Sequence, residues 1–557
     1  MVTSQVEILN GIPRLVINGK PVPPLAYMTY LTDRACYADF AASGYRLFSF
    51  PVFFGFNRLN QHSGLDVFKK GIFDGSDPDY SVFDRDVEAI LSNCPDAFIF
   101  PRVNVNPSEY YERENPDECC SCGRICIASD KWASDVKAQL TGLVRHVESS
   151  PYAHRIAGYQ IAGGNTEEWL PLEPQGLSGR RAYEKFAEYY PGKSPEEDPA
   201  LFHRFYSLIT AELVCGLAAH VKALTRRRLV VGSFYGYTFE CPHPPFPHHA
   251  LRQMLSSPDI DFICSPISYS NLRTPGRDHP YMVPFASVRH HGKLYFTEND
   301  TRTHLSRPVN SMPHYNGPIW YGPDSETTEQ IMLLHAAKDI VNAHGGWWFD
   351  MWGGWYSHQP YMKLAEKLLA TAKESLDLPC KSLAQIAVFA DEEVLCRADS
   401  SANAGEVVFG IREAIGKLGA PVDYYLTGDM EAAVGYSAVI SLIPAESQNS
   451  KKLKDLCREK NIPLLEIRRD NSGITPDELR AFARRANVHI WCDRDCVVYA
   501  NESFLFLHTA GEESFTVTDP EGAELWDVIS DRPFSARFTS KAGRSCLLRR
   551  YPNKVTK

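Results

Sequence analysis

The sequence predicts an α/β protein: a (β/α)8 TIM barrel followed by a flavodoxin-like α/β domain and a small C-terminal β-sandwich. Eight short apolar runs alternate with helical stretches over the first 360 or so residues, and eight strands with crossovers favour a closed barrel. The pattern changes near residue 380 and again near residue 490, where helical periodicity ends. No glycine-rich phosphate motif follows the first strand, which disfavours a nucleotide-binding sheet.

The predicted elements begin with a β-hairpin at residues 5–20, where apolar and polar residues alternate around Asn10-Gly11. Eight apolar runs are of the kind that suits buried parallel strands. They lie at residues 23–30, 45–52, 97–105, 155–163, 228–237, 261–269, 293–300 and 345–352. The main helical stretches between them lie at residues 83–95, 130–149, 203–226 and 326–343.

Three domains are expected from these patterns. The catalytic barrel and its hairpin take residues 1–380, the flavodoxin-like unit takes residues 381–489, and the β-sandwich takes residues 490–557. The middle unit carries helical stretches at 404–418 and 449–460.

Composition excludes several classes of protein. The 557 residues are 44% hydrophobic and 23% charged, which excludes a disordered chain and a disulfide scaffold. Lysine and arginine number 58 against 68 aspartates and glutamates, so there is no basic surplus for nucleic acid or an anionic membrane. The N-terminal residues lack a signal-peptide pattern and no run of 18 apolar residues occurs, so we expect a cytoplasmic protein without membrane spans.

The 15 cysteines are mostly scattered, which suits reduced thiols. One cluster differs, because Cys119, Cys120, Cys122 and Cys126 fall within eight residues. Four thiols can hold a structural zinc ion, but this spacing is not the paired C-x-x-C of zinc sites. Plain thiols are therefore favoured, structural zinc stays open, and no organic cofactor is expected.

Carboxylates follow two of the predicted barrel strands. The fourth strand leads into Glu167 and Glu168, and the seventh ends at Glu298. Since the carboxyl ends of barrel strands meet at one mouth, Glu298 and one of the paired glutamates can face each other there. Retaining glycoside hydrolysis needs such a pair, one protonated acid and one nucleophilic anion about 5–5.5 Å apart. Trp169 is an apolar neighbour that raises the pKa of a carboxyl group, so Glu168 is favoured over Glu167 as the acid.

Three segments carry a resemblance to a known group: GYQIAGGNTEEW (158–169), YFTEND (295–300) and GGWWFDMWGGW (345–355). With the domain order, they make the chain resemble clan A glycoside hydrolases, in particular the family 42 β-galactosidases and the related family 164 β-mannosidases. The resemblance implies that Glu298 is the nucleophile and that Glu168 or Glu167 is the acid/base. It further implies a retaining exo-β-glycosidase acting on β-galactosides or β-mannosides. It also implies a homo-oligomer, with a trimer favoured, in which the flavodoxin-like unit at residues 381–489 is the oligomer contact.

The resemblance is incomplete at one position. The acid/base of the clan directly follows an Asn that hydrogen-bonds the sugar 2-OH, whereas Asn165 lies three residues before Glu168. A catalytically inactive carbohydrate-binding protein on a hydrolase barrel therefore remains the alternative. Metal-dependent hydrolysis is disfavoured, because no H-x-H ends the first strand.

Other side chains are expected to bind the sugar or to support the nucleophile. Arg46 is predicted to pair with Glu298 and lower its pKa. Aromatic residues make up 12% of the chain, and four of its nine tryptophans (Trp347, Trp348, Trp352 and Trp355) gather at the eighth strand. The full set of expected sugar-binding residues is Asn165, Arg46, Tyr235, Tyr269, Trp320, Trp348 and Trp352.

Overall fold

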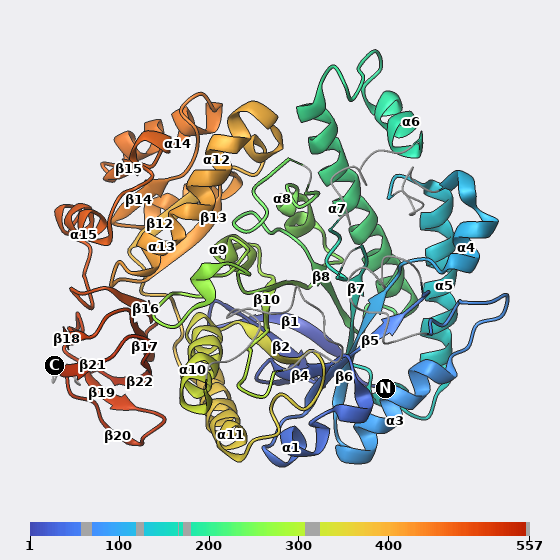
Figure 1. The fold of residues 1–557 in the computed structure, drawn as a ribbon, viewed down its shortest axis with the longest axis horizontal. Helices are drawn as coiled ribbons and strands as arrows, with labels where there is room; N and C mark the ends of the chain where they lie inside the picture. Colours follow the sequence, from blue (N-terminus) through green and yellow to red (C-terminus); the bar gives the residue numbers. More distant parts are fainter. Residues whose placement is uncertain are drawn as a thin grey trace.

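A computed structural model describes residues 1–56, 70–118, 127–164, 166–170, 180–244, 246–306 and 324–552 (Figure 1). Its centre is a closed barrel of eight parallel strands, which confirms the predicted (β/α)8 fold. The barrel strands are β4 (Leu25–Thr29), β5 (Leu47–Phe53), β6 (Phe98–Asn104), β7 (Gly158–Ala162), β8 (Val230–Phe234), β9 (Phe262–Pro266), β10 (Leu294–Asn299) and β11 (Gly345–Asp350). Each falls within one of the eight predicted runs or extends it by one residue.

Helices surround the barrel, and their ends follow local capping chemistry. Asp198 accepts a hydrogen bond from the Leu201 N–H at the start of α7, where Pro199 occupies the first turn. The helices of the barrel region are α1 (Tyr37–Ala42), α3 (Ser81–Asn93), α4 (Glu109–Glu114), α5 (Asp130–Ser149), α6 (Arg180–Tyr189), α7 (Pro199–Leu224), α8 (Leu251–Ser256), α9 (Phe285–His290), α10 (Ser325–Asn342) and α11 (Gln359–Glu374).

Within the described residues, α7 is the one helix long and apolar enough to cross a membrane. It contacts α5, α8 and β8 of the barrel, and half of its most apolar window is buried. Packing against the barrel accounts for its apolar composition, as in the core helix of a globular domain.

The N-terminal hairpin covers the amino ends of the barrel strands. It consists of β1 (Ser4–Leu9) and β2 (Ile12–Ile17), extended by β3 (Lys20–Pro21). The Ser4 N–H donates to the Arg228 carbonyl (2.8 Å), and the Ser4 hydroxyl accepts from the Val230 N–H (2.9 Å) at the start of β8. Because the hairpin covers this end, a functional site is expected at the opposite end of the barrel, where the carboxyl ends of the strands lie.

A four-stranded parallel sheet follows the barrel, at the upper left of Figure 1. Its order is β13-β12-β14-β15, which fits the predicted flavodoxin-like unit. Arg289 of α9 forms an ion pair with Asp423 (2.9 Å) and joins the sheet to the barrel. Its elements are β12 (Ile386–Ala390), α12 (Ala398–Gly410), α13 (Arg412–Gly416), β13 (Val422–Leu426), β14 (Ala438–Ser441), α14 (Gln448–Glu459), β15 (Leu464–Glu466) and α15 (Pro476–Arg485).

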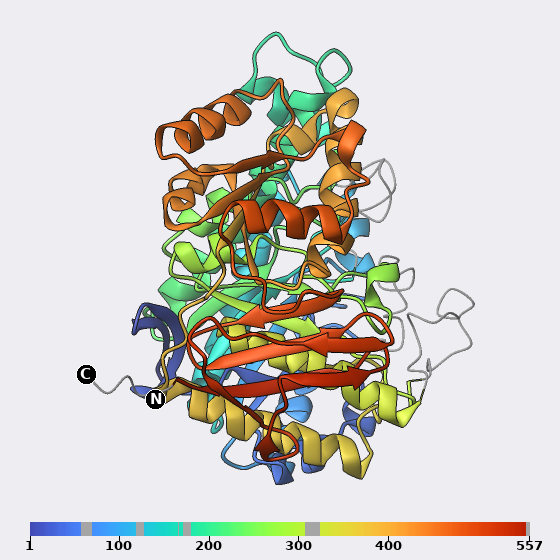
Figure 2. The same cartoon turned by 90° about the vertical axis from the view of Figure 1, so that its left-hand side faces the viewer.

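The C-terminal part is antiparallel β-structure, which faces the viewer in Figure 2. A five-stranded sheet packs against α10 of the barrel, where the Asn501 side chain donates to the Val341 carbonyl (2.7 Å). β18 and β21 form a separate two-stranded sheet. The strands are β16 (Cys496–Ala500), β17 (Phe504–Thr509), β18 (Glu513–Thr516), β19 (Glu524–Asp527), β20 (Arg532–Pro533), β21 (Arg537–Ser540) and β22 (Ser545–Tyr551).

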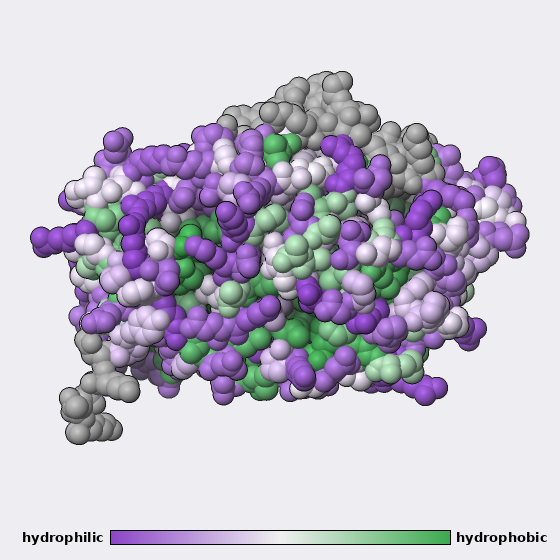
Figure 3. Space-filling view, turned by 90° about the horizontal axis from the view of Figure 1, so that it is seen from below, coloured by the Kyte–Doolittle hydropathy of each residue, from purple (hydrophilic) through white to green (hydrophobic). Residues whose placement is uncertain are grey.

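The surface is mostly polar. Figure 3 shows one face on which hydrophilic residues predominate and hydrophobic ones form smaller groups between them. Few large hydrophobic side chains are exposed in the described part of the chain: Met1, Ile8, Tyr183, Tyr189, Val434 and Tyr551.

Candidate active site

Glu298 lies near the carboxyl end of β10, inside the barrel mouth. It is only 3% exposed, and its Oε2 accepts from Arg102 Nη2 (2.6 Å) and Trp347 Nε1 (3.1 Å). Burial raises the pKa of Glu298, while the Arg102 guanidinium opposes the rise. The two donors favour the anion, which is the form that a nucleophile needs.

Glu167 and Glu168 lie on a tight turn after β7. Three residues of the turn that are not glycine have positive φ: Thr166 (52°), Glu167 (72°) and Trp169 (58°). The turn is closed by a hydrogen bond from the Trp169 N–H to the Gly163 carbonyl (2.6 Å), and the buried Trp169 indole donates to Ser233 Oγ (2.9 Å). Left-handed backbone at such residues is strained and clusters at functional sites, where packing holds it in place.

Glu168 is buried and meets neutral donors. Its Oε1 accepts from the Tyr237 hydroxyl (2.8 Å), and its Oε2 accepts from the Thr166 hydroxyl. Burial and the nearby charge of Glu298 raise the pKa of Glu168 to about 8. A carboxyl group in this setting holds its proton at neutral pH, which is what a general acid requires.

Glu167 is fully buried beside the same arginine that binds Glu298. Its Oε2 accepts from the Tyr30 hydroxyl (2.6 Å) and from Arg102 Nη1 (3.2 Å), whereas its Oε1 has no hydrogen-bond partner in the part of the chain that the structure describes. Burial raises the pKa of Glu167 to about 7, against the opposing charge of Arg102. Because the guanidinium contacts both carboxyl groups, Glu167 and Glu298 lie side by side.

Asp300 forms a second charged group just beyond β10. It accepts from the Tyr269 hydroxyl (2.7 Å) and forms ion pairs with Arg273 (3.2 Å) and Arg302 (2.7 Å). Asp300 also contributes to the raised pKa of Glu298. The structure therefore connects Tyr269, a predicted site residue, to the barrel mouth through Asp300.

Arg46 does not bind Glu298, so that prediction is wrong. It precedes β5, at the amino end of the barrel, and forms an ion pair there with Asp96 (2.7 Å). The site lies at the other end of the strands. Arg102 on β6 makes the contact that was expected of Arg46.

Tyr235 and Trp348 also face away from the barrel mouth. The Tyr235 hydroxyl donates to the Ser207 carbonyl of α7 (2.9 Å), and Trp348 Nε1 donates to the Tyr45 hydroxyl (2.8 Å). Their predicted roles in sugar binding are therefore wrong. Tyr237 and Trp347 reach the carboxylates instead. Adjacent residues of a strand point to opposite faces, and the sequence prediction chose the wrong member of the Trp347–Trp348 pair.

Trp352 lies at the mouth, with its ring 6.1 Å from that of Tyr30, the partner of Glu167. Asn165, Trp320 and the cluster Cys119, Cys120, Cys122 and Cys126 fall outside the described residues. Where the structure does describe the chain, no group of three or more His, Cys, Asp or Glu side chains could hold a metal ion.

Three residues of the site were missed from the sequence: Tyr30, Arg102 and Tyr237. Trp347 was noted only as one of the tryptophans gathered at the eighth strand. Arg102 had a visible signal, because it is a charged residue within the apolar run 97–105. A buried charge in a strand needs a charged partner, and Arg102 has two. The guanidinium also lies 4.6 Å from the Phe234 ring centroid and 5.1 Å from that of Trp347.

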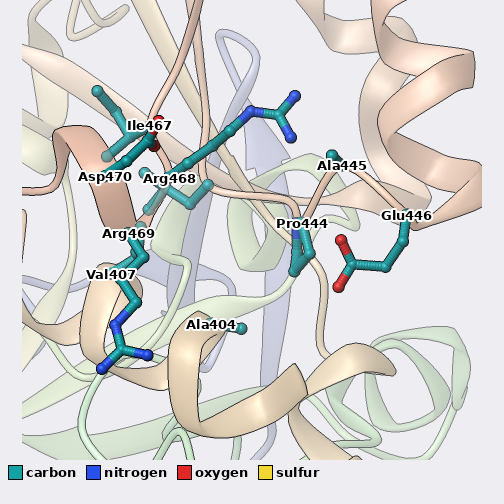
Figure 4. Close-up of a pocket in the computed structure, with 10 residues that line it drawn as sticks. Ala404, Val407, Pro444, Ala445, Glu446, Ile467, Arg468, Arg469 and Asp470 are labelled. Atoms are coloured by element: carbon teal, nitrogen blue, oxygen red, sulfur yellow. The ribbon is translucent and has the colours of Figure 1, made fainter. Parts of the chain in front are cut away.

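A separate pocket of about 290 Å³ lies beyond the carboxyl ends of β14 and β15 (Figure 4). Glu446 stands on one side of it, with Arg468 and Arg469 on the other. Arg468 forms an ion pair with Glu466 (2.6 Å) and Arg469 with Glu406 (3.6 Å). Its arginines are thus already paired, and it has nothing like the buried carboxyl pair of the barrel mouth.

The fold is similar to that of solved β-galactosidases, among them a family 42 enzyme. The β-galactosidase of the psychrophilic Marinomonas ef1 has a TM-score of 0.63 and 12% identity, over 94% of this chain and 99% of that chain. A catalytic mutant of a family 42 β-galactosidase from G. stearothermophilus has a TM-score of 0.61 and 8% identity, over 95% of this chain and 98% of that chain.

The same fold occurs in α-L-fucosidase isoenzyme 2 of Paenibacillus thiaminolyticus, with a TM-score of 0.59 and 10% identity, over 95% of this chain and 100% of that chain. No family model matches the sequence, and no curated protein matches it. At such low identities the structural likeness establishes the architecture, and the activity has to be argued from the site.

Proposed function

We propose that this protein is a retaining exo-β-glycosidase, with Glu298 as nucleophile and Glu168 as acid/base. The observation that carries the proposal is the pair of buried carboxyl groups at one barrel mouth in unlike surroundings. Glu298 accepts from a guanidinium, which favours its anion, while Glu168 accepts from two hydroxyls and has a pKa raised to about 8 by burial and the charge of Glu298. The solved β-galactosidases with this fold agree with a glycosidase.

Glu168 suits the acid/base role better than Glu167. Arg102 binds Glu167 directly, and an adjacent cation favours the ionised form of a carboxyl group. None of the described cationic side chains forms an ion pair with Glu168. The proton needed for the leaving group is therefore held better on Glu168.

The reaction proceeds in two displacements. In the first, Glu298 attacks the anomeric carbon, the glycosidic C–O bond breaks, and the proton of Glu168 passes to the departing oxygen. In the second, Glu168 removes a proton from water, which attacks the anomeric carbon and releases the sugar and Glu298. Arg102 and Trp347 stabilise the carboxylate of Glu298 when it is free.

The substrates that we propose first are β-galactosides and β-mannosides. β-Galactosides follow from the names of the solved neighbours, and β-mannosides rest on the sequence resemblance to family 164. The fold is also that of an α-L-fucosidase, so it does not by itself select the sugar.

A panel of 4-nitrophenyl glycosides tests this proposal. We expect the wild-type protein to release nitrophenol from at least one β-glycoside, with the β-configured sugar as the first product seen by NMR. For the corresponding methyl β-glycoside, which has a poor leaving group, Glu168→Gln should reduce kcat/KM by about 10²–10⁴-fold, and Glu298→Gln should abolish turnover of both substrates. A protein that binds sugars without turnover would be the inactive carbohydrate-binding protein, and an α-configured first product would contradict the retaining mechanism.

A further inference from the structure

Glu167 is a third carboxyl group in the site, and the two-step reaction does not use it. It is fully buried, and none of the described residues forms a hydrogen bond with its Oε1. A buried polar atom without a partner costs about 1–3 kcal/mol, so it calls for an explanation. A substrate group that donates to Oε1 would supply the missing partner.

The charges around Glu167 are also incomplete. Among the described residues, Arg102 is the cation that pairs with Glu167, and it pairs with Glu298 as well. Arg273 and Arg302 are engaged with Asp300. Two carboxyl groups therefore share one guanidinium, and a second positive charge beside Glu167 would be attracted by the carboxylate form of that residue, more strongly than it would be in water.

Position determines which part of a substrate can reach Glu167. Arg102 bridges Glu298 (2.6 Å) and Glu167 (3.2 Å), so the carboxyl group of Glu167 lies next to the nucleophile. Glu298 has to reach C1 of the sugar. The two ring neighbours of C1 are C2 and the ring oxygen, and the ring oxygen has no proton to donate. The substituent on C2 is thus the nearest ring substituent that can donate to Glu167.

We propose that Glu167 recognises the C2 substituent and that the preferred substrate is a β-linked 2-amino-2-deoxy sugar, whose ammonium group donates to Oε1 and neutralises the carboxylate. A hydroxyl at C2 would supply a donor but no charge, and an acetamido group would remove the charge and add bulk. The Tyr30 hydroxyl and Arg102 hold the other oxygen of Glu167, so the carboxyl group is fixed for this contact. The inference rests on the proposed glycosidase function and specifies its substrate class.

The wild-type enzyme alone gives the first test. The substrates are 4-nitrophenyl 2-amino-2-deoxy-β-glucoside and β-galactoside, together with their 2-hydroxy and 2-acetamido counterparts. We expect kcat/KM for an amino sugar to exceed that of its 2-hydroxy counterpart by at least about tenfold. If the 2-hydroxy or acetamido sugars are cleaved as well or better, the inference fails and the glycosidase function stands. If none is cleaved, along with the wider panel, the proposed function itself fails.

Glu167→Gln then tests the residue. It keeps the shape of the side chain and removes the charge, so we expect kcat/KM for the amino sugar to fall at least about tenfold further than kcat/KM for the 2-hydroxy sugar. Glu392→Gln is the matched control, because Glu392 is another buried glutamate, which accepts from the Leu251 N–H (2.7 Å) away from the site. An equal loss on both substrates would make Glu167 a positioning residue for Arg102 and would overturn the assignment.

Discussion

At the scale of single residues, the site depends on how the Glu168 proton is held. A hydrogen bond donated to a carboxylate stabilises the charged form, so the Tyr237 hydroxyl lowers the pKa of Glu168 from the value that burial alone would give. Tyr237 is thus expected to adjust the pH range of the acid without taking part in the bond changes.

Tyr237→Phe should move the alkaline limb of kcat/KM to higher pH. In the wild type this limb should lie near the Glu168 pKa of about 8, because activity is lost as the acid gives up its proton. A pH–rate profile measures the shift. Tyr235→Phe is the control, since its hydroxyl donates to Ser207 outside the site. A limb that moves to lower pH in Tyr237→Phe would contradict the assignment of Glu168.

Glu168→Gln should stabilise the folded protein more at pH 8 than at pH 5. The pKa of Glu168 is about 8 when folded against an ordinary value of 4.5, so the folded state binds more protons between these values. The free energy of unfolding of the wild type therefore falls as pH rises through this window, by an amount on the order of a few kcal/mol. Glutamine does not ionise, so the variant does not show this fall. Thermal melts at both pH values, with the exposed Glu446→Gln as control, measure the difference. An increase in melting temperature at pH 5 but not at pH 8 would contradict a raised pKa of Glu168.

Arg102→Lys should lower kcat by about 10²-fold or more, because a single ammonium cannot bridge Glu167 and Glu298 as the guanidinium does. Arg46→Lys is the matched control at the opposite end of the barrel. Steady-state kinetics on one aryl glycoside compare the two. Full activity of Arg102→Lys would show that catalysis does not need the guanidinium to bridge Glu167 and Glu298.

At the scale of elements, the turn after β7 fixes the acid. Its positive φ angles at Thr166, Glu167 and Trp169 are kept in place by the buried Trp169 side chain. The turn is thus a strained element anchored to β8 through Ser233, and its geometry determines where Glu168 points.

Ser233→Ala should therefore reduce both stability and turnover. The indole of Trp169 would lose its acceptor, which costs about 1–3 kcal/mol, and the turn would hold Glu168 less firmly. Chemical denaturation and kcat are the measurements. Ser265→Ala on β9 is the control, because that hydroxyl is buried in the barrel but bonds to Tyr295. Equal losses of kcat in both variants would show that the turn has no special role.

The strands and helices were predictable from the sequence, whereas the direction in which their side chains point was much harder to predict. Eight apolar runs identify eight strands because buried parallel strands need continuous hydrophobic residues. Glu298 follows from its position at a strand end. Trp348 was predicted in place of Trp347 because neighbouring residues of a strand point to opposite faces, and a shift of one residue exchanges them. The prediction for Arg46 was wrong because Arg46 lies at the amino end of its strand, away from the mouth.

At the scale of the whole molecule, the assembly remains a prediction. We propose a homo-oligomer, most simply a trimer, in which the flavodoxin-like unit provides contacts between subunits. Light scattering at micromolar concentration should give about three times the mass of the chain. A monomer under these conditions would end the proposal, and a dimer would exclude the trimer.

The N-terminal hairpin has a practical consequence. Met1 is exposed at 76%, and the hairpin that follows it closes the amino end of the barrel, opposite the mouth. A surface or bead coupled through Met1 would hold the molecule with its open end toward the solution. A protein immobilised in this way should keep its barrel mouth accessible to large ligands, which coupling at random surface lysines would partly obstruct.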